Sequence, residues 1–387
     1  MADTTQAPEV DYTLNNPDTL TKYKTAAQIS HKVLEAVTAL CLEGEKIVEI
    51  CQKGDQLLDE EIAKVYKGKK IAKGISHPTT VSPNSYVTPY TPLVSDAAEA
   101  ETTLKAGEIV KIQLGAQIDG FGTIVCDMLV VAKKDSAKEV VTGREADLIL
   151  ATHYANELLL RLMIPQAPPT QAHISSLLEK VAKAYDCKLV ENTTSWLFDR
   201  NEIEGTKKII LAPGDGVRGD GVPEVGEVWG VEIGLSLGSG KVKNLDHRAT
   251  LHRRTTTTYI LKRPSSRQTL SEVVKKFGTF PFSLRQLEDE KAAKVGVVEC
   301  VRNGVLRQYE PAGDAEGAAV SRLLSTIAIT KNGLTKLAAP TIDLEQFKSD
   351  KKIEDEEILK ILEQPLARST GNKKSKSKKK KTAGGEE

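Results

Sequence analysis

The chain has 387 residues, of which 40% are apolar and 28% charged, and this composition excludes a fibrous repeat and wholesale disorder. Its length predicts about two to three structural units. No apolar run approaches the roughly 18 to 20 residues of a membrane span, and the N-terminus lacks the pattern of a secretion signal. Five cysteines without a C-x-x-C pair indicate neither a disulfide framework nor a thiolate zinc site. We therefore expect a soluble, non-secreted protein of a reducing compartment.

The net charge of +1 conceals two basic segments. Residues 367–387 hold eight Lys and Arg against two Glu, and residues 253–307 hold twelve against five acids, so their net charges are +6 and +7 and the remaining chain carries −12. Seven lysines lie within positions 373–381, a density that favours phosphate binding through counterion release. We expect this tail to be disordered in isolation. Nucleic acid is the favoured partner, and a solubilising role or an anionic membrane surface is the alternative.

The first half of the chain predicts two helices followed by a hairpin. After a polar arm at residues 1–20, apolar residues recur at helical spacing from Ile29 to Leu40, and a second helix has Asp55 as its N-cap and Gly68 as its stop. Residues 74–92, rich in Pro and Ser, predict a loop. Two β-branched runs joined around Asp119 and Gly120 predict a hairpin, namely residues 109–115 and 123–131.

The same order then recurs. Thr142 and Glu145 predict a capping box for a helix that ends at Pro165. A further helix spans Ile174 to Tyr185, and a strand follows at residues 228–235. The opening of this strand, residues 226–234, matches residues 107–115 in pattern at an offset of 119, so we predict two related halves around a pseudo-twofold axis. Gln113 and Glu232 occupy equivalent places.

A basic insert and a last strand complete the predicted core. One helix ends at Gly278, a second is predicted within residues 284–294, and Asn303-Gly304 predicts a type I′ hairpin between residues 297–301 and 305–309. Two helices followed by a hairpin are typical of a small winged-helix unit. A strand at residues 320–330 returns the chain to the body.

Several of these segments carry a family resemblance, which covers nearly the whole chain: Tyr23-Lys24 and residues 74–92, 107–122, 227–241 and 277–282. The sequence resembles the proliferation-associated, ErbB-binding protein family, which has the pita-bread fold of type II methionine aminopeptidases. The resemblance implies an α+β fold of the creatinase/aminopeptidase type, with the insert where type II enzymes carry theirs. It also implies binding to curved DNA, as in the fungal branch, or to ribosomal RNA and ribosomes.

The active enzymes of this fold bind two metal ions through two Asp, one His and two Glu, because anionic oxygens and an imidazole must hold the cations that activate water. The resemblance places these ligands, in chain order, at Gln113, Ile124, Trp196, Glu232 and Leu324. It places a further histidine that serves the substrate at Pro89. Glu232 alone retains a ligand's chemistry, so we expect no metal, no cofactor and no catalysis by this route.

A lone buried carboxylate is costly unless it is neutralised. Arg322 lies two residues before Leu324 on the same predicted strand, so both side chains face the former site. We predict an ion pair between Arg322 and Glu232 that is capped by Trp196 and Ile124 and fills the space of the metals. The alternative is a protonated or hydrated Glu232.

These observations predict a non-catalytic pita-bread protein of the nucleus, nucleolus and cytoplasm that binds DNA or structured RNA. The large ribosomal subunit and other proteins are further expected partners, with roles in ribosome biogenesis, translation or growth regulation. A metal-dependent methionine aminopeptidase and a protein-interaction scaffold are the alternatives. The predicted units are the arm at 1–20, the pita-bread domain at 21–252 and 308–349, the insert at 253–307, and a C-terminal helix with the tail at 350–387. The predicted phosphate-binding residues lie in the insert and the tail: Arg253, Arg254, Lys262, Arg263, Arg267, Lys275, Lys276, Lys373, Lys374, Lys376, Lys378, Lys379, Lys380 and Lys381.

Overall fold

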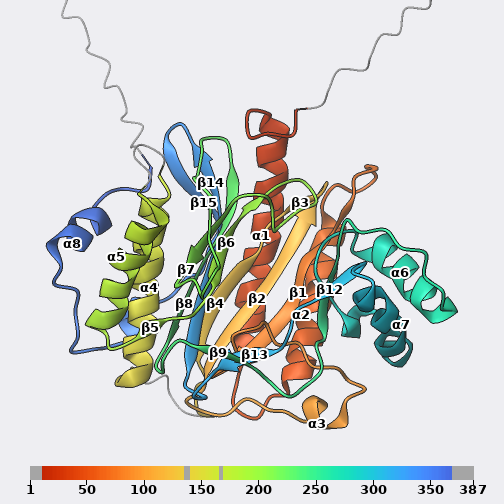
Figure 1. The fold of residues 1–387 in the computed structure, drawn as a ribbon, viewed down its shortest axis with the longest axis horizontal. Helices are drawn as coiled ribbons and strands as arrows, with labels where there is room; N and C mark the ends of the chain where they lie inside the picture. The colour runs from red at the N-terminus through yellow and green to blue at the C-terminus, as the bar shows by residue number, and fades with distance from the viewer. Residues whose placement is uncertain (1–10, 135–139, 165–168, 368–387) are drawn as a thin grey trace, which may run out of the picture.

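The computed structural model describes residues 11–134, 140–164 and 169–367 (Figure 1). The first half of the chain contains α1 (Pro17–Leu40), α2 (Ile47–Lys64), β1 (Lys73–Pro83), α3 (Ala97–Ala100), β2 (Ile109–Ile118), β3 (Phe121–Gly122) and β4 (Val125–Val130). The chain continues with α4 (Arg144–Leu162), α5 (Gln171–Ala184), β5 (Lys188–Leu189), β6 (Thr193–Phe198), β7 (Lys208–Leu211), β8 (Val228–Ser236) and β9 (Val242–Asn244). The remaining elements are β10 (Leu251–Arg254), α6 (Pro264–Lys276), β11 (Phe282–Ser283), the 3₁₀ helix η1 (Leu284–Gln286), α7 (Glu290–Arg302), β12 (Leu306–Gln308), β13 (Ala312–Asp314), β14 (Val320–Thr330), β15 (Gly333–Ala338), the 3₁₀ helix η2 (Leu344–Gln346) and α8 (Glu356–Leu362).

The strands of the large sheet are arranged in two similar sets on either side of its centre. In the described part of the chain it has ten strands, and its main path runs β1-β2-β4-β14-β8-β6-β7. From the central β4–β14 pair outward, the strands are β4, β2 and β1 on one side and β14, β8 and β6 on the other. Each set is preceded in the chain by two long helices, α1 and α2 or α4 and α5. The predicted pseudo-twofold arrangement of two related halves is therefore confirmed.

The two halves meet at the seam between β4 and β14, which is sparse in backbone pairing. Whereas β14 pairs with β8 along nine residue pairs, its pairing with β4 comprises the single pair Leu324 and Cys126. Thr326 supplements the ladder, because its hydroxyl donates to the carbonyl of Ile124 and accepts from the amide of the same residue. Side chains thus replace part of the backbone bonding between the halves.

Each half buries its own pair of helices. Residues of α1 and α2, such as Val33, Val37 and Leu58, form one buried cluster with alternate residues of β2. Residues of α4 and α5 form a second cluster with alternate residues of β8 and β14. The first helix begins where Pro17 takes the first helical position and Asn16 accepts a hydrogen bond from the amide of Asp18, which satisfies a free N–H group. It therefore includes the last four residues of the predicted polar arm.

Three local predictions in the main body are wrong. Residues 74–92 were predicted as a loop, but residues 73–83 form the long buried strand β1, whose register shifts around Pro78 accommodate the proline. Asp55 is not an N-cap, since it lies in the interior of α2, which starts at Ile47 and ends before Gly68. The N-cap of α4 is Gly143, and no side chain caps it, so the capping box of Thr142 and Glu145 does not form.

The insert folds into a compact unit at one side of the body (Figure 1). Its helices α6 and α7 pack against each other beside a three-stranded antiparallel sheet of order β11-β10-β12. The predicted hairpin at Asn303-Gly304 is wrong: residues 297–301 belong to α7, and Gly304, with φ +69°, follows the C-cap residue Asn303. The amide of Val305 returns to the carbonyl of Cys300, as in a glycine-terminated helix end. The same dipeptide that suits a tight turn thus serves here as a helix stop.

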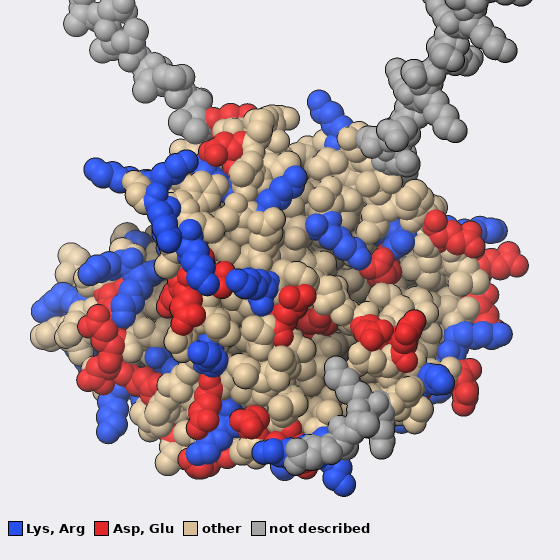
Figure 2. Space-filling view, turned by 180° about the vertical axis from the view of Figure 1, so that it is seen from behind, with Lys and Arg blue, Asp and Glu red and all other residues tan. Residues whose placement is uncertain are grey.

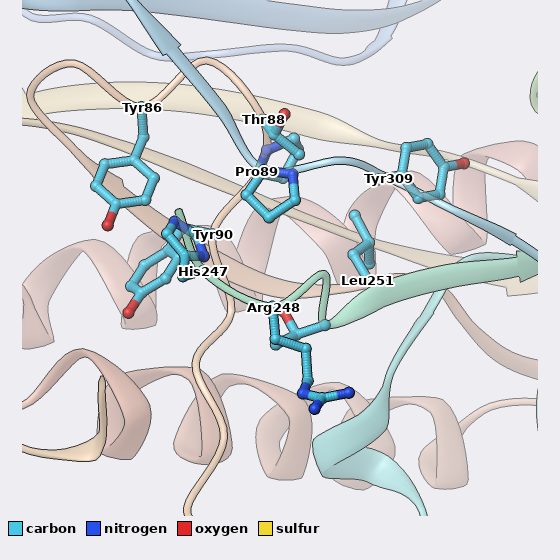
Figure 3. A pocket seen from close by; sticks show the side chains of 10 residues that line it. Tyr86, Thr88, Pro89, Tyr90, His247, Arg248, Leu251 and Tyr309 are labelled. Atoms are coloured by element: carbon cyan, nitrogen blue, oxygen red, sulfur yellow. The ribbon is translucent and has the colours of Figure 1, made fainter. Parts of the chain in front are cut away.

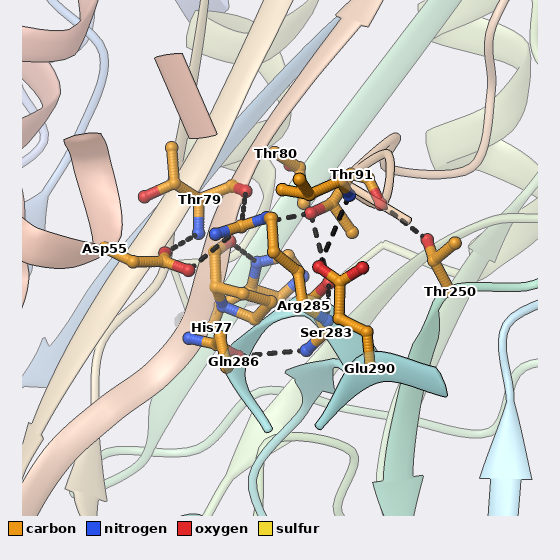
Figure 4. Close-up of polar contacts among 12 residues, drawn as sticks. Asp55, His77, Thr79, Thr80, Thr91, Thr250, Ser283, Arg285, Gln286 and Glu290 are labelled. Atoms are coloured by element: carbon orange, nitrogen blue, oxygen red, sulfur yellow. Dashed lines mark hydrogen bonds and ion pairs between the residues drawn. The ribbon is translucent and has the colours of Figure 1, made fainter. Parts of the chain in front are cut away.

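A buried ion pair joins the insert to the body (Figure 4). Arg285 of η1 lies 2.9 Å from Asp55 of α2, and their side chains are only 4% and 9% exposed. The guanidinium also donates to the hydroxyl of Thr91 at 3.2 Å, and the other carboxylate oxygen of Asp55 accepts from the amide of Thr79 at 2.7 Å. Arg285 also donates to the carbonyl of Thr79 in β1 at 3.5 Å, so it couples the insert to both α2 and β1.

The last described residues return to the sheet. After α8, Ala367 forms an isolated bridge with Gly333 at the start of β15. The predicted Lys-rich tail and its phosphate-binding lysines lie outside the described residues. Within the described ranges, no helix combines the length and the apolar character needed to cross a membrane.

Candidate functional site: a pocket without a metal-binding set

Four directly opposed residues form a row across the centre of the sheet. Gln113 of β2 pairs with Cys126 of β4, Cys126 with Leu324 of β14, and Leu324 with Glu232 of β8. Opposed residues of antiparallel strands project to the same face. The neighbours of Gln113 and Glu232 along each strand belong to the helix-covered clusters instead. The row therefore lies on the sheet face that the four long helices leave uncovered, at the seam between the halves.

A pocket of about 330 Å³ opens above this row, and we call it the central pocket. Its walls include every position at which the resemblance placed a ligand or substrate residue, together with the predicted partner of Glu232: Pro89, Gln113, Ile124, Trp196, Glu232, Arg322 and Leu324. These residues are up to 235 positions apart in the chain. The sequence therefore identified residues that do lie together, although their assigned roles remain proposals.

Arg322 starts a chain of hydrogen bonds through the pocket floor. Its Nη1 donates to the carbonyl of Val87 at 2.5 Å, and its Nη2 donates to Oε1 of Gln113 at 2.8 Å. The amide nitrogen of Gln113 lies 3.0 Å from Nε2 of His77, whose Nδ1 lies 2.8 Å from the carbonyl of Pro78. Burial lowers the pKa of His77 to about 3. The ring is therefore neutral near pH 7, with a proton on Nδ1 and an acceptor at Nε2.

Glu232 is the one carboxylate at the positions where the resemblance placed metal ligands, and it lies close to Arg322. Its Oε1 is 3.7 Å from the Nε of Arg322, which is an ion-pair contact but longer than a hydrogen bond. Burial raises the pKa of Glu232, and the Arg322 charge opposes this rise. The predicted pairing is thus present as a contact, whereas the closest side-chain partner of Arg322 is Gln113. The central pocket also remains open, so the pair does not fill its space.

The residues of this site do not fit a metal pair. Ile124, Trp196 and Leu324 offer no lone pair to a hard cation, and Gln113 offers only a neutral amide oxygen, which accepts from Arg322. The Arg322 guanidinium places a fixed positive charge beside Glu232. Among the described residues, no cluster of three or more His, Cys, Asp or Glu is arranged to hold a metal ion. The donor set therefore disagrees with the chemistry of the two-metal peptidases.

An acidic cluster at the mouth of the pocket holds three side chains of the insert region. Arg253 contacts Glu202 at 2.6 Å and Glu204 at 3.2 Å, and Arg307 contacts Glu204 at 2.6 Å. Tyr309 donates its hydroxyl to Glu204 at 2.7 Å. Arg253 is only 7% exposed, so its predicted role as a phosphate ligand is wrong: its charge is already neutralised inside the protein.

The other predicted cations of the insert are accessible to different extents. Arg254 is half-buried, whereas the exposed ones are Lys262, Arg263, Arg267, Lys275 and Lys276. Lys276 pairs with Glu272 at 2.6 Å. Within the described ranges, Lys262, Arg263, Arg267 and Lys275 form no ion pair within 4 Å. Figure 2 shows Lys and Arg interspersed with Asp and Glu on the left side of the rear face, where the insert lies.

A small side pocket adjoins the central one (Figure 3). It measures about 10 Å³, about the space of one water molecule, and shares Thr88, Pro89, Leu251 and Tyr309 with the central pocket. Tyr86 and Tyr90 lie beside the imidazole of His247 with ring centroids 5.6 Å away in both cases, Tyr86 tilted and Tyr90 edge-on. The side pocket therefore lies where the segment before β10 packs against the loop that follows β1, and it is too small for a substrate.

Comparison with known proteins identifies the family. The profile of Metallopeptidase family M24 matches residues 21–247. The chain belongs to this family. The Curved DNA-binding protein of Schizosaccharomyces pombe is 42% identical over 376 residues, which are 96% of this chain and 97% of that protein. The ERBB-3 BINDING PROTEIN 1 of Arabidopsis thaliana is 36% identical and covers 92% of this chain and 89% of its own length.

A solved structure extends the M24 assignment to the fold. It is described as a thermophilic Arx1, is 64% identical, and superposes with a TM-score of 0.89 over 91% of this chain and 100% of its own. The predicted pita-bread fold and the predicted family resemblance are both confirmed.

The sequence missed two parts of this M24 site. His77 falls within the predicted loop at residues 74–92, but it lies on β1, and its Nε2 is 3.0 Å from the amide nitrogen of Gln113. Glu204, which holds Arg253, Arg307 and Tyr309, was not considered. No local pattern marks Glu204, because its partners lie 49 to 105 positions away in the chain.

Proposed function

We propose that this M24 protein is non-catalytic and binds nucleic acid, either DNA or structured RNA including ribosomal RNA. The observation that carries the first part is the position of Arg322, which donates to Gln113 and lies 3.7 Å from Glu232. Two-metal peptidases need anionic oxygens at these places to hold cations and to lower the pKa of a bridging water. A guanidinium there repels a divalent ion and occupies an oxygen that could otherwise serve as a ligand.

The second part is supported by the charge that remains at the surface of the insert. Three of its cations, Arg253, Arg285 and Arg307, pair with acids of the main body, which reduces the formal +7 of the segment to an effective +4. Several of its acids are engaged as well: Glu299 accepts from two backbone amides and Glu290 from two others. We propose that the exposed cations of α6 and of the segment just before it, together with the tail, whose sequence has a net charge of +6, act as the phosphate-binding basic surface.

Such a surface would bind phosphate oxygens, which position a duplex without reading its bases. A relative bears the name Curved DNA-binding protein, and shape offers a physical route to that preference. Pre-bent or narrow-groove sequences cost less free energy to deform onto a rigid basic surface. We propose that the protein acts in the nucleus, nucleolus and cytoplasm, and that the large ribosomal subunit is a further partner through its RNA.

The test is the salt dependence of binding to duplex DNA and to a structured ribosomal RNA fragment. About six neutralised phosphates give a log-log slope near −5 on duplex DNA. Removing residues 367–387, or replacing Lys262, Arg263, Arg267 and Lys275 by Ala, should flatten the slope by about 0.9 for each phosphate that the variant no longer neutralises. The matched control replaces Lys352 and Lys360, exposed lysines of the C-terminal segment, and should leave the slope unchanged. An unaltered slope in both basic-surface variants would refute the proposal.

The alternatives predict different results. An M24 aminopeptidase would contain two stoichiometric divalent ions in freshly isolated protein and would cleave a tripeptide that begins with Met. A protein-interaction scaffold would keep its partners in a pull-down after nuclease treatment, whereas a nucleic-acid-binding protein would release them.

A further inference from the structure

The central pocket contains two polar groups that lack partners. Within the described residues, the Glu232 carboxylate accepts no hydrogen bond, and its nearest cation is 3.7 Å away. The Nε–H of Arg322 is buried and unpaired, and this side chain is only 10% exposed. A buried polar group without a hydrogen bond costs free energy, which applies to the Nε–H of Arg322. The Glu232 side chain is 21% exposed, so its carboxylate is open to a polar ligand that enters the pocket.

The charges of the lining favour a cation. The pocket walls carry four carboxylates, Glu191, Glu204, Glu232 and Glu310, against the two cations Arg307 and Arg322. Glu204 is paired with Arg253 and Arg307, and Glu191 with Lys241, so Glu232 and Glu310 are the two carboxylates of the lining with no cation within hydrogen-bond distance among the described residues. The two Nη atoms of Arg322 already donate to the neutral groups of Val87 and Gln113, so the guanidinium keeps its positive charge. This charge repels a singly charged ammonium group about half as strongly as a divalent ion at the same distance. An ammonium group could donate to Glu232 without displacing any existing hydrogen bond.

The aromatic wall favours the same ligand chemistry. Trp196 is half-buried in the wall of the pocket, and the ammonium of Lys208 lies 5.6 Å from the centroid of its ring. Indole rings attract ammonium groups through their π-electron density. The volume of about 330 Å³ lies at the small end of the range for ligand pockets, which suits one long side chain.

We propose that the central pocket binds a lysine side chain from the chain's own tail, residues 373–381. This segment supplies seven ammonium groups and carries no acid, so it complements the net negative lining. Its tether starts from the sheet that carries the site. Ala367 bridges Gly333, which pairs with Thr330 at the end of the strand that bears Arg322 and Leu324.

The reach of the tail is sufficient. Thr330 is six residues along β14 from Leu324, which corresponds to about 20 Å. Crossing from Thr330 through Gly333 to Ala367 adds about 10 Å at the usual spacing between strands. Lys376 and Lys381 lie nine and fourteen residues beyond Ala367, and extended segments of these lengths span about 30 and 46 Å. The second half of the lysine run can therefore enter the pocket intramolecularly.

This intramolecular binding would compete with the basic surface. A lysine that is bound in the pocket cannot neutralise a phosphate, so the pocket and nucleic acid would compete for the same lysines of the tail. This consequence rests on the proposed function, whereas the binding of the tail in the pocket does not. The full chain would bind nucleic acid more weakly than expected if all seven tail lysines were free. A variant whose pocket no longer binds lysine, such as Glu232→Gln, would bind nucleic acid more tightly.

Tryptophan fluorescence in the absence of nucleic acid tests whether the tail occupies the pocket. The chain has two tryptophans, and Trp229 is fully buried, so quenching by acrylamide reports on Trp196. We expect the quenching constant to rise about twofold when residues 368–387 are removed, because a short tether gives millimolar effective concentrations that half-occupy a weak site. Replacing the seven tail lysines by Gln should give the same rise in a chain of full length.

A second experiment tests whether the protection of Trp196 from acrylamide depends on Glu232. A synthetic peptide of residues 368–387 should restore protection to the truncated chain, and Glu232→Gln should abolish this effect. Glu356→Gln, an exposed control on α8, should not. Equal quenching of the full and truncated chains would overturn the proposal. Protection that grows with protein concentration would also overturn it, because the occupant would then be a second copy.

Discussion

The ion pair between Asp55 and Arg285 makes a sharp prediction about how the insert is attached. Its side chains are 9% and 4% exposed, and removing one member of a buried pair leaves an uncompensated charge that costs about 3 to 5 kcal/mol. Asp55→Ala also removes the acceptor of the Thr79 amide. We therefore expect Asp55→Ala to lower the free energy of unfolding by about 4 kcal/mol.

The assay combines guanidinium denaturation with hydrogen exchange. Because Arg285 lies in the insert, exchange should accelerate in α6 and α7 more than in β8 and β14 of the main body. The double variant Asp55→Leu with Arg285→Met should recover most of the stability, since replacing both charges by apolar groups of similar size is often neutral. Glu101→Ala, which breaks the exposed pair with Lys46, is the control and should leave the midpoint unchanged. A destabilisation below about 1 kcal/mol for Asp55→Ala would refute the reasoning.

Two further predictions concern pH. The pKa of His77 is lowered to about 3 in the folded state from an ordinary 6.5, so the unfolded chain binds the extra proton and stability is lost as pH falls from about 6.5 toward 3. His77→Gln should flatten that part of the pH profile of the unfolding free energy, and an identical slope would contradict the buried neutral ring. The pKa of Glu232 is raised from 4.5, so the folded state holds its proton more tightly and stability falls as pH rises above 4.5. Glu232→Gln should remove this decline. A steeper decline in the variant would contradict the prediction, because it would mean that the Arg322 charge lowers the pKa of Glu232 by more than burial raises it.

The sequence predicted the centre of the site better than its surroundings. The repeated pattern around Gln113 and Glu232 placed both on equivalent strands, because a period of two fixes which side chains share a face. The strand at residues 320–330 and its inward-facing Arg322 were predicted for the same reason. The alternation of side chains along a strand is enough to predict the face of the sheet that a residue occupies.

The errors arise where tertiary contacts override local preferences. Residues 297–301 are rich in valine and suggested a strand, but Val297 and Cys300 are buried on one helical face against α6. The prolines of residues 74–92 suggested a loop, although an edge strand with register shifts tolerates them. Arg253 was counted as a free cation because its partners Glu202 and Glu204 lie about fifty positions away.

The same limit applies to charge as a guide to function. Net charge is a property of the sequence, whereas the charge available to a phosphate depends on which cations the fold has already paired. In this protein three of the twelve cations of the insert are paired with acids of the main body, and no local pattern distinguishes them from the rest.

Because few backbone pairs join the two halves at the seam, Arg322 contributes to holding them together. Its backbone belongs to β14 of the second half, whereas both acceptors of its Nη atoms, Val87 and Gln113, belong to the first. The backbone ladder is thinnest beneath it, where Leu324 and Cys126 form the one residue pair between β14 and β4 in the described chain. In a two-metal peptidase, cations shared by ligands from both halves would tie the molecule together at this point. Here Arg322, together with Thr326, supplies side-chain hydrogen bonds that join the two halves at this point.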